Sequence, residues 1–243
     1  MARIFITGSA DGLGQLAAKS LVEQGHQVVL HARNESRGLE ALDKVPRAET
    51  VLIGDLSSID ETKQLAAAVN ALGSFDAVIH NAGVYQAPSE TIVKVNILAP
   101  YILTSLIDPP KRLIYLSSGM HTGGQAKLAQ LKGDYRGINY SDSKLQVLML
   151  TLAVARLWYH VSANAVDPGW VPTKMGGAGA PDDLQQGYET QTWLATSDAA
   201  TLSGQYYFHR QQRSFNPEAS KENLQNDLLK ACEQITGVKF PQQ

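Results

Sequence analysis

The sequence is poor in cysteine, and no charge of one sign dominates it. Cys232 is the only cysteine among 243 residues, which excludes an internal disulfide framework and any metal cluster built from several thiolates. The 21 Lys and Arg residues and the 23 Asp and Glu residues leave a formal net charge of −2. The chain therefore lacks the basic footprint expected of a protein that binds nucleic acid or an anionic membrane surface.

Long hydrophobic runs and metal-ligand spacings are also absent. The most apolar stretch, 145–155, contains Gln146 and Thr151, whereas a membrane-spanning helix needs about 18 or more apolar residues. The apolar stretch after Met1 is too short for a secretory signal, so we expect a cytoplasmic protein. The histidines at 121, 160 and 209 share no metal-ligand spacing. We therefore predict no metal site and interpret each as a surface or packing residue.

Apolar residues make up 44% of the chain, which is typical of a globular protein with a substantial core, and the length favours a single domain over 1–243. Short apolar runs alternate with helical patterns. We predict strands at Arg3–Thr7, Gln27–His31, Thr50–Ile53, Phe75–His80, Arg112–Ser117, Ser162–Val166 and Gln205–Phe208, and helices at Leu13–Gln24, Ile59–Leu72, Thr91–Leu106, Tyr140–Trp158 and Asp182–Ala195. This alternation predicts an α/β fold, a doubly wound parallel sheet of about seven strands with helices on both faces. Ligands of such sheets bind beyond the carboxyl ends of the strands.

A glycine-rich turn joins the first predicted strand to the first helix. Glycines at such a turn let the backbone approach a ligand, and the helix N-terminus offers unpaired N–H groups to a diphosphate. Three residues separate the first two glycines, rather than one, so the turn alone also fits a simple packing turn. Its position at the first strand–helix junction favours dinucleotide binding. The candidate binding residues here are Gly8, Ser9, Asp11, Gly12, Leu13 and Gly14.

The end of the second strand indicates which dinucleotide binds. An NAD site usually has an acidic residue there, whereas an NADP site has an arginine. This strand ends in Arg33 and Asn34 without a carboxylate, and a guanidinium can pair bidentately with a 2′-phosphate. Asp11 in the glycine turn does not help a phosphate, and Arg33 can also be a solvated surface residue. We favour NADP(H) over NAD(H).

Two later strands end in residues that the cofactor would pass. Asp55 and Leu56 follow the third strand, and Asn81, Ala82 and Gly83 follow the fourth. The small side chains of Ala82 and Gly83 let backbone atoms reach a ligand. Asp55 can equally be a helix cap.

The reactive residues are predicted at the start of a long apolar helix. Tyr140 and Lys144 lie four residues apart and so share one helical face. A nearby cation lowers the pKa of a phenol, which suits tyrosine for proton transfer near neutral pH. The preceding strand ends in Ser117 and Ser118, whose hydroxyls face the same strand-end crevice.

These motifs, taken in order, resemble those of the short-chain dehydrogenase/reductase family over nearly the whole chain. The glycine turn matches the family's turn, and Asn81-Ala82-Gly83 matches its Asn-Ala-Gly element, although His80 stands where a first Asn is common. The resemblance implies a Rossmann fold and four catalytic residues. It assigns proton transfer to Tyr140, carbonyl polarisation to Ser118, ribose binding and lowering of the tyrosine pKa to Lys144, and a water-linked proton relay to Asn96.

The family also has a Pro-Gly segment that lines the nicotinamide face of the cofactor. Here that segment comprises Pro168, Gly169, Trp170, Val171 and Thr173, and the resemblance places Thr173 at the nicotinamide carboxamide.

The implied activity is NADP(H)-dependent hydride transfer between nicotinamide and a small carbonyl or alcohol substrate. One alternative is a non-catalytic regulatory protein of the same fold that senses NADP(H). Another is an isomerase that recycles the cofactor in place. We expect a substrate loop or lid around 173–196, in which the glycine-rich 176–181 is either a hinge or a plain flexible loop.

Two segments depart from the family pattern. Tyr140 follows Ser118 by 22 positions (140 − 118), a long gap that predicts either a solvated surface excursion over 119–139 or part of the substrate mouth. The helix after Asn96 is cut short by Pro109 and its neighbour Pro110. In the family this helix often forms a subunit interface, so a tetramer is doubtful and a monomer or homodimer is expected.

Arg33→Asp tests the cofactor prediction. The substitution should weaken NADPH binding much more than NADH binding, because only NADPH carries the 2′-phosphate. Fluorescence titration with each nucleotide measures this, and equal effects on both would refute phosphate recognition by Arg33.

Overall fold

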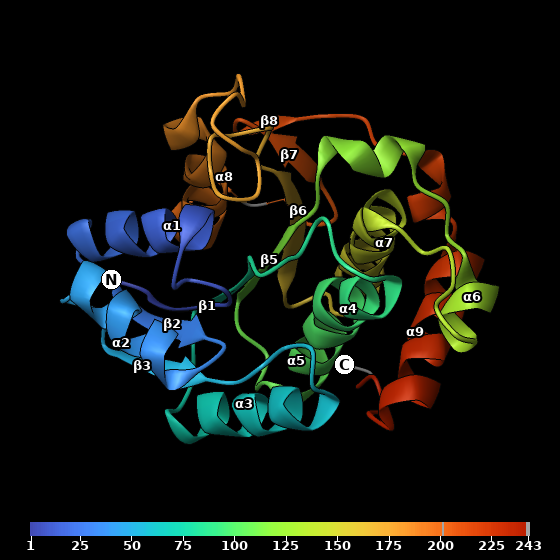
Figure 1. Cartoon of the computed structure of the whole chain (residues 1–243), viewed down its shortest axis with the longest axis horizontal. Helices are drawn as coiled ribbons and strands as arrows, with labels where there is room; N and C mark the ends of the chain where they lie inside the picture. The colour runs from blue at the N-terminus through green and yellow to red at the C-terminus, as the bar shows by residue number, and fades with distance from the viewer. Residues whose placement is uncertain (201, 242–243) are drawn as a thin grey trace.

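The structure is a computed structural model that describes residues 1–200 and 202–241, and it contains one eight-stranded sheet with helices on both faces (Figure 1). The strands are β1 (Arg3–Ile6), β2 (Gln27–Ala32), β3 (Thr50–Ile53), β4 (Ala77–His80), β5 (Arg112–Leu116), β6 (Ser162–Asp167), β7 (Tyr206–Phe208) and β8 (Gln211–Gln212). Their order is β3-β2-β1-β4-β5-β6-β7-β8. All neighbours pair in parallel except β7 and β8. The doubly wound α/β fold is confirmed, and the short antiparallel β8 is an addition that the apolar pattern does not predict.

The helical elements are α1 (Gly12–Glu23), α2 (Glu35–Lys44), α3 (Ile59–Ala71), α4 (Ser89–Val93), η1 (Lys94–Leu98), α5 (Ala99–Leu106), η2 (Gly119–Gly123), α6 (Leu128–Lys132), α7 (Tyr140–Leu157), α8 (Leu184–Thr196), η3 (Pro217–Ser220) and α9 (Glu222–Thr236). The sequence patterns miss α2 and α6, whereas α9 contains Cys232, which we expect late in a helix and buried. Glycine has a low helix propensity, but Gly38 lies inside α2, where a Cβ would lie 2.7 Å from Ile53 Cδ1. The glycine therefore lets α2 pack closely on β3, a reason visible only in the folded chain.

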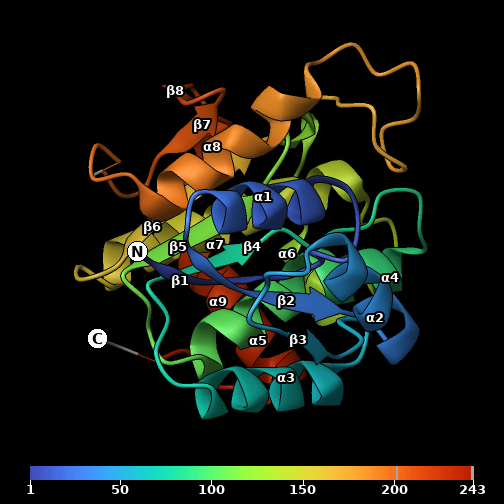
Figure 2. The same cartoon turned by 90° about the vertical axis from the view of Figure 1, so that its left-hand side faces the viewer.

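Each central strand is covered on both faces. In β1, Phe5 packs into the cluster that contains α3, α5 and α7, whereas Ile4 and Ile6 pack into the cluster that contains α1 and α8. Figure 2 shows α1 and α8 on one side of the sheet and α3 and α5 on the other. This explains why the strands read as continuous apolar runs.

Helix α7 lies between the sheet and α9, and nearly all of its length is buried. A helix that is apolar on all sides needs such a position, because no face of it can meet water without cost. None of the helices within the described residues is both long and apolar enough to cross a bilayer. The first turn of α7, which carries Tyr140 and Lys144, lies against the end of β5.

A buried carboxylate begins α7 and anchors the loop before it. Asp142 is 2% exposed and accepts hydrogen bonds from the backbone N–H groups of Asn139 and Gln125, each at 2.9 Å. The Lys127 ammonium lies 2.8 Å from the same carboxylate. The segment 119–139 is thus anchored to the start of α7, although most of its residues are exposed, as the first alternative above predicts.

Asp142→Ala should lower the free energy of unfolding by about 2–4 kcal/mol, because it removes a buried acceptor of several hydrogen bonds and leaves Lys127 without its counter-charge. Urea unfolding followed by circular dichroism measures this. Asp43→Ala, at an exposed position on α2, is the matched control and should change stability by less than about 0.5 kcal/mol. Equal effects of the two substitutions would contradict the anchoring role of Asp142.

Candidate active site

The glycine turn between β1 and α1 is packed against the end of β4. Gly8 and Gly12 have φ values of +64° and +56°, a left-handed conformation that suits glycine. A Cβ on Gly14 would lie 2.3 Å from Asn81 Nδ2 and 2.6 Å from the Gly8 carbonyl oxygen. The turn therefore needs glycine for close backbone packing as well as for its conformation.

The Asn81-Ala82-Gly83 element at the end of β4 holds this turn in place through hydrogen bonds. Asn81 Nδ2 donates to the carbonyl oxygens of Thr7 and Gly8 at 3.0 and 3.2 Å. The backbone N–H of Ala82 donates to Thr7 Oγ1 at 3.1 Å. Asn81 thus holds the turn in shape, and Thr7 is a supporting residue that the list of predicted binding residues omits.

A buried histidine ties the turn to β2 and β3. Gly8 N–H donates to His31 Nδ1 at 2.9 Å, so Nε2 carries the proton and donates to the Gly54 carbonyl oxygen at 2.9 Å. Ser9 Oγ accepts from the backbone N–H of His31 at 2.8 Å. Burial lowers the pKa of His31 to about 4, so the ring is neutral at physiological pH. Nothing in the sequence pattern singled out His31.

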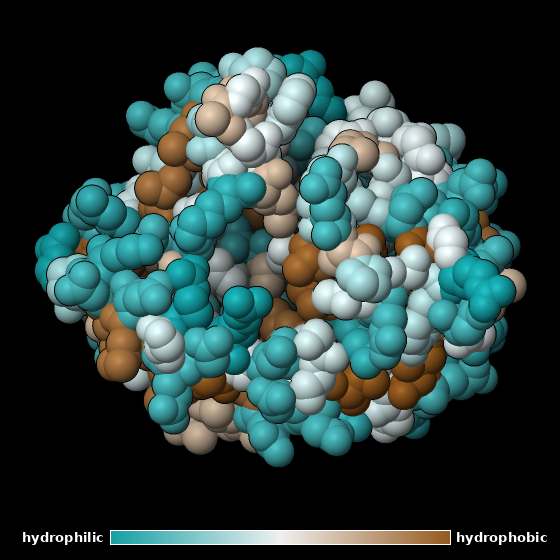
Figure 3. Space-filling model, in the orientation of Figure 1, coloured by the Kyte–Doolittle hydropathy of each residue, from teal (hydrophilic) through white to brown (hydrophobic). Residues whose placement is uncertain are grey.

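The N-terminus of α1 opens into a cavity that joins two predicted binding segments. The cavity has a volume of about 250 Å³ and is lined by Asp11, Gly12, Gln15, Leu16, Pro172, Thr173, Lys174 and Leu184. The glycine turn and the Pro-Gly segment lie far apart in the sequence, and the fold brings them to the two sides of this cavity. Figure 3 shows the same face of the molecule hollowed near its centre, between the region of α1 and α8 and that of α4 and α7.

Two cations that the sequence analysis missed surround Asp11. Lys174 forms an ion pair with the Asp11 carboxylate from the Pro-Gly segment, and Arg37 Nη2 lies 3.2 Å from the same carboxylate. The hydrogen bond from Lys174 is the main cause that lowers the pKa of Asp11. The negative charge in the glycine turn is therefore compensated on both sides.

The other predicted cofactor residues hold their own turns. Asn34 accepts a hydrogen bond from the backbone N–H of Arg37 at 3.0 Å and caps α2, and Arg33 is exposed beside it. Asp55 accepts from Ser57 Oγ at 2.8 Å, within the turn before α3. The next residue, Leu56, is buried in the core that contains α3.

The Pro-Gly segment leaves the end of β6 and turns sharply. Gly169 has a φ value of +81°, and Val171 is buried. The Trp170 side chain is 60% exposed, and its Nε1 donates to the Gly176 carbonyl oxygen at 2.8 Å. Trp170 therefore braces the following glycine-rich loop.

The first turn of α7 places Tyr140 and Lys144 against the end of β5. Lys144 is 4% exposed, and its Nζ donates to the Leu116 carbonyl oxygen at 2.7 Å. Ser117 Oγ donates to the backbone carbonyl oxygen of Lys144 at 2.9 Å. Lys144 Nζ lies 5.3 Å from the centroid of the Tyr140 ring, so the two side chains share a face of the helix as the spacing predicts.

The pKa of Tyr140 moves in the direction opposite to the one expected from the sequence. Burial of the phenol raises it to about 12, and a side-chain hydrogen bond with Ser118 lowers it in part. Lys144 is not among the groups that shift this pKa, and its ammonium donates to the Leu116 carbonyl oxygen. Burial lowers the pKa of Lys144 itself to about 8. The Ser118 side chain nevertheless lies close enough to the phenol to affect its pKa, so the two side chains are neighbours at the strand ends.

Asn96 lies in the π-helical turn η1 and fastens the strand-end segment to α7. Its Oδ1 accepts from the Val84 N–H at 2.8 Å, and its Nδ2 donates to the Val84 carbonyl oxygen at 2.9 Å and to Ser143 Oγ at 3.0 Å. A Cβ on Gly83 would lie 3.5 Å from Asn96 Oδ1 and 3.4 Å from Lys144 Nζ. The small residue at 83 leaves room for these two groups to approach each other.

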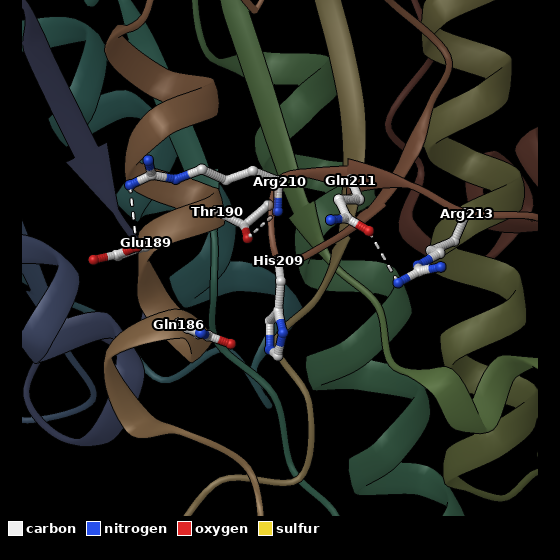
Figure 4. Close-up of a pocket in the computed structure, with 7 residues that line it drawn as sticks. All are labelled: Gln186, Glu189, Thr190, His209, Arg210, Gln211 and Arg213. Carbon is white, nitrogen blue, oxygen red and sulfur yellow. Dashed lines mark hydrogen bonds and ion pairs between the residues drawn. The ribbon is translucent and has the colours of Figure 1, made fainter.

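A larger cavity of about 290 Å³ lies between α8 and the turn from β7 to β8 (Figure 4). None of the predicted site residues lines it, and its lining residues are Gln186, Glu189, Thr190, His209, Arg210, Gln211 and Arg213. Gln186, Glu189 and Thr190 belong to the region 173–196 that is predicted to contact the substrate, whereas the predicted catalytic and cofactor residues lie at the strand ends and at the smaller cavity.

The fold and these side chains together define a dinucleotide-binding α/β protein with a serine, tyrosine and lysine at the strand ends. A family model described as short chain dehydrogenase matches residues 2–183. The chain is 43% identical to the short-chain dehydrogenase chyC of Penicillium rubens, over 99% of this chain and 100% of that protein. The chain therefore belongs to the short-chain dehydrogenase family of oxidoreductases.

Solved structures agree with this assignment of the fold. A crystal structure of a protein from Mycobacterium paratuberculosis has a TM-score of 0.82 at 25% identity, over 99% of this chain and 95% of that one. The RhlG/NADP complex of Pseudomonas aeruginosa has a TM-score of 0.69 at 20% identity, over 85% of this chain and 96% of that one.

Gly14→Ala should lower the free energy of unfolding by about 1–3 kcal/mol and weaken dinucleotide binding, because the added Cβ collides with Asn81 and the Gly8 backbone. Thermal unfolding and fluorescence titration with NADPH measure the two effects. Gly179→Ala is the control, since a Cβ at that position meets nothing within 4 Å. A Gly14→Ala protein with wild-type stability and affinity would contradict the packing role of this glycine.

Proposed function

We propose that the protein is an NADP(H)-dependent oxidoreductase that interconverts a carbonyl and an alcohol in a small-molecule substrate. The observation that carries this proposal is that the Tyr140 phenol has the Ser118 side chain and the buried ammonium of Lys144 as neighbours, the latter 5.3 Å from its ring centroid. Two hydroxyl donors that converge on one carbonyl oxygen stabilise the negative charge that develops there during reduction. The bound nicotinamide supplies or accepts the hydride.

In this proposal each residue has a distinct task. Tyr140 gives its proton to the substrate oxygen in reduction and takes it back in oxidation. Its high pKa in the absence of nucleotide favours the protonated form, which is the form needed to polarise a carbonyl. Ser118 would orient the carbonyl group of the substrate. Lys144 would bind the nicotinamide ribose, and its ammonium group, once directed toward the ribose and the phenol, would lower the pKa of Tyr140. Asn96 links Lys144 to water.

The residues present fit a dinucleotide. The N-terminus of α1 opens into the cavity, and its N–H groups suit a diphosphate, although the Asp11 carboxylate accepts from the Gly12 N–H there. The cavity is bordered on its other side by Thr173 of the Pro-Gly segment. The neighbour from Pseudomonas aeruginosa is described as an NADP complex, which supports NADP(H) here by analogy.

Arg33 at the end of β2 and the half-buried Arg37 next to Asp11 add two cations on the adenosine side. We propose that both contribute to recognition of the 2′-phosphate, and that the region 173–196 forms the substrate loop of the single domain.

Tyr140→Phe tests the proposed mechanism. It should leave NADPH binding unchanged and reduce turnover by about 100-fold or more, because the proton donor is lost. The assay is a panel of aldehydes and ketones followed at the reduced-nicotinamide absorbance band, with bound NADPH oxidation measured by stopped flow. Tyr159→Phe is the matched control, since the Tyr159 side chain is 77% exposed.

Two outcomes of this experiment separate the alternatives. Turnover that persists in Tyr140→Phe would show that Tyr140 is not the proton donor. Tight NADPH binding by the wild-type protein, with no oxidation by any member of the panel and none in the reverse direction with alcohols, would favour the regulatory alternative.

A further inference from the structure

Asp167 is a carboxylate at the end of β6 that none of the roles described so far uses. Alternate residues of β6, Ala163 and Ala165, pack into the cluster that contains α7, and the two-residue period of a strand directs Asp167 to the same face. Its Oδ1 accepts from the Gly169 N–H at 2.9 Å, and its Oδ2 accepts from the Tyr206 hydroxyl at 3.1 Å. The carboxylate thus joins the Pro-Gly segment to β7.

The same carboxylate touches the segment that carries Ser118. A Cβ on Gly119 would lie 2.9 Å from Asp167 Oδ2, so only a residue without a side chain lets the backbone after Ser118 approach so closely. The glycine at 119 is therefore explained by Asp167.

His121 completes the connection between Tyr206 and Ser118. Its ring packs edge-on against Tyr206 with 4.6 Å between the ring centroids. The backbone N–H of Asn216 donates to His121 Nε2 at 3.2 Å, so Nδ1 carries the proton and donates to the Ser118 carbonyl oxygen at 2.7 Å. The sequence analysis interpreted His121 as a surface or packing residue, and its full burial makes it a packing residue.

The charge of Asp167 also acts on the two proton-carrying groups of α7. It raises the pKa of Tyr140 in addition to burial, and it raises the pKa of Lys144 against the larger lowering effect of burial. The other groups that face the phenol are the Ser118 hydroxyl, the Lys144 ammonium and the edge of Tyr85, at 4.9 Å between ring centroids.

The surroundings of Lys144 contain no second carboxylate among the groups that shift its pKa. Its Nζ faces the Leu116 carbonyl oxygen, the backbone at Gly83 and the amide of Asn96. Leu116, whose carbonyl oxygen holds the ammonium group, pairs with Val166 of β6, so Asp167 follows at the adjacent strand end and is the carboxylate whose charge acts on Lys144.

We propose that Asp167 is a positioning residue of the acid–base centre, which joins the Pro-Gly segment to Tyr206 beneath Ser118 and keeps Lys144 charged and Tyr140 protonated near neutral pH. This deepens the proposed function, because it concerns the same centre. Removal of the negative charge should shift the titration of Lys144 to lower pH.

The test follows the titration of Lys144 by NMR in protein labelled with ¹³Cε-lysine and prepared without nucleotide, with Lys144→Met to assign the resonance. The wild-type lysine should titrate near pH 8. In Asp167→Asn, which keeps an oxygen acceptor but loses the charge, the midpoint should fall by about one pH unit. Asp43→Asn, the same chemical change at an exposed position on α2, should leave the midpoint at its wild-type value.

Two further variants separate charge from structure. Tyr206→Phe removes the hydrogen bond to Asp167 but keeps the carboxylate, and Asp167→Glu keeps the charge at a slightly different place. In both variants the titration midpoint of Lys144 should lie closer to the wild-type value than it does in Asp167→Asn. A wild-type midpoint in Asp167→Asn, or the same shift in Asp167→Asn and Tyr206→Phe, would overturn the proposal.

The wild-type protein offers a test that does not depend on folding of the Asp167 variants. Because two interacting charges affect each other reciprocally, one ¹³Cγ-aspartate resonance should show an inflection near pH 8 that disappears in Lys144→Met. If no aspartate resonance shows it, the proposal fails. None of these measurements requires turnover, so failure of the proposed reaction in the Tyr140→Phe assay is a separate result.

Discussion

The buried ammonium group of Lys144 is the constraint on which the arrangement of the active site depends. A charge that is 4% exposed is stable only where polar partners replace water. The Leu116 carbonyl oxygen at the end of β5 accepts a hydrogen bond from the ammonium group. The absence of a side chain at Gly83 leaves space beside the same nitrogen atom. These contacts fix the position of the first turn of α7 relative to the strand ends. They therefore also fix the position of Tyr140, which lies one helical turn before Lys144.

The cofactor side of the site depends on a second set of long-range contacts at the same edge of the sheet. Asn81 and Thr7 hold the glycine turn, and His31 connects it to the ends of β2 and β3. Lys174 reaches the turn from the Pro-Gly segment through its ion pair with Asp11. Because four strand ends are joined in this way, the segments predicted to bind the dinucleotide are presented as one surface rather than as separate loops.

Much of this arrangement was predictable from local pattern. The apolar runs identified the seven parallel strands, because strands covered on both faces have no polar side to interrupt them. The spacing of Tyr140 and Lys144 placed them on one helical face. The sequence predicted the wrong direction for the pKa shift of Tyr140, because that shift depends mainly on how deeply the phenol is buried.

What the sequence by itself determined is the order of strands and helices, the glycine turn, and the set of side chains that stand at the strand ends. These features follow from short-range periodicity and from the conformational freedom of glycine. Only the tertiary structure decided which of those side chains touch. Arg37 meets Asp11, and Asp167 meets Tyr206, across gaps of 26 and 39 residues. The packing of helices on a twisted sheet sets such distances, and no local pattern along the chain records them.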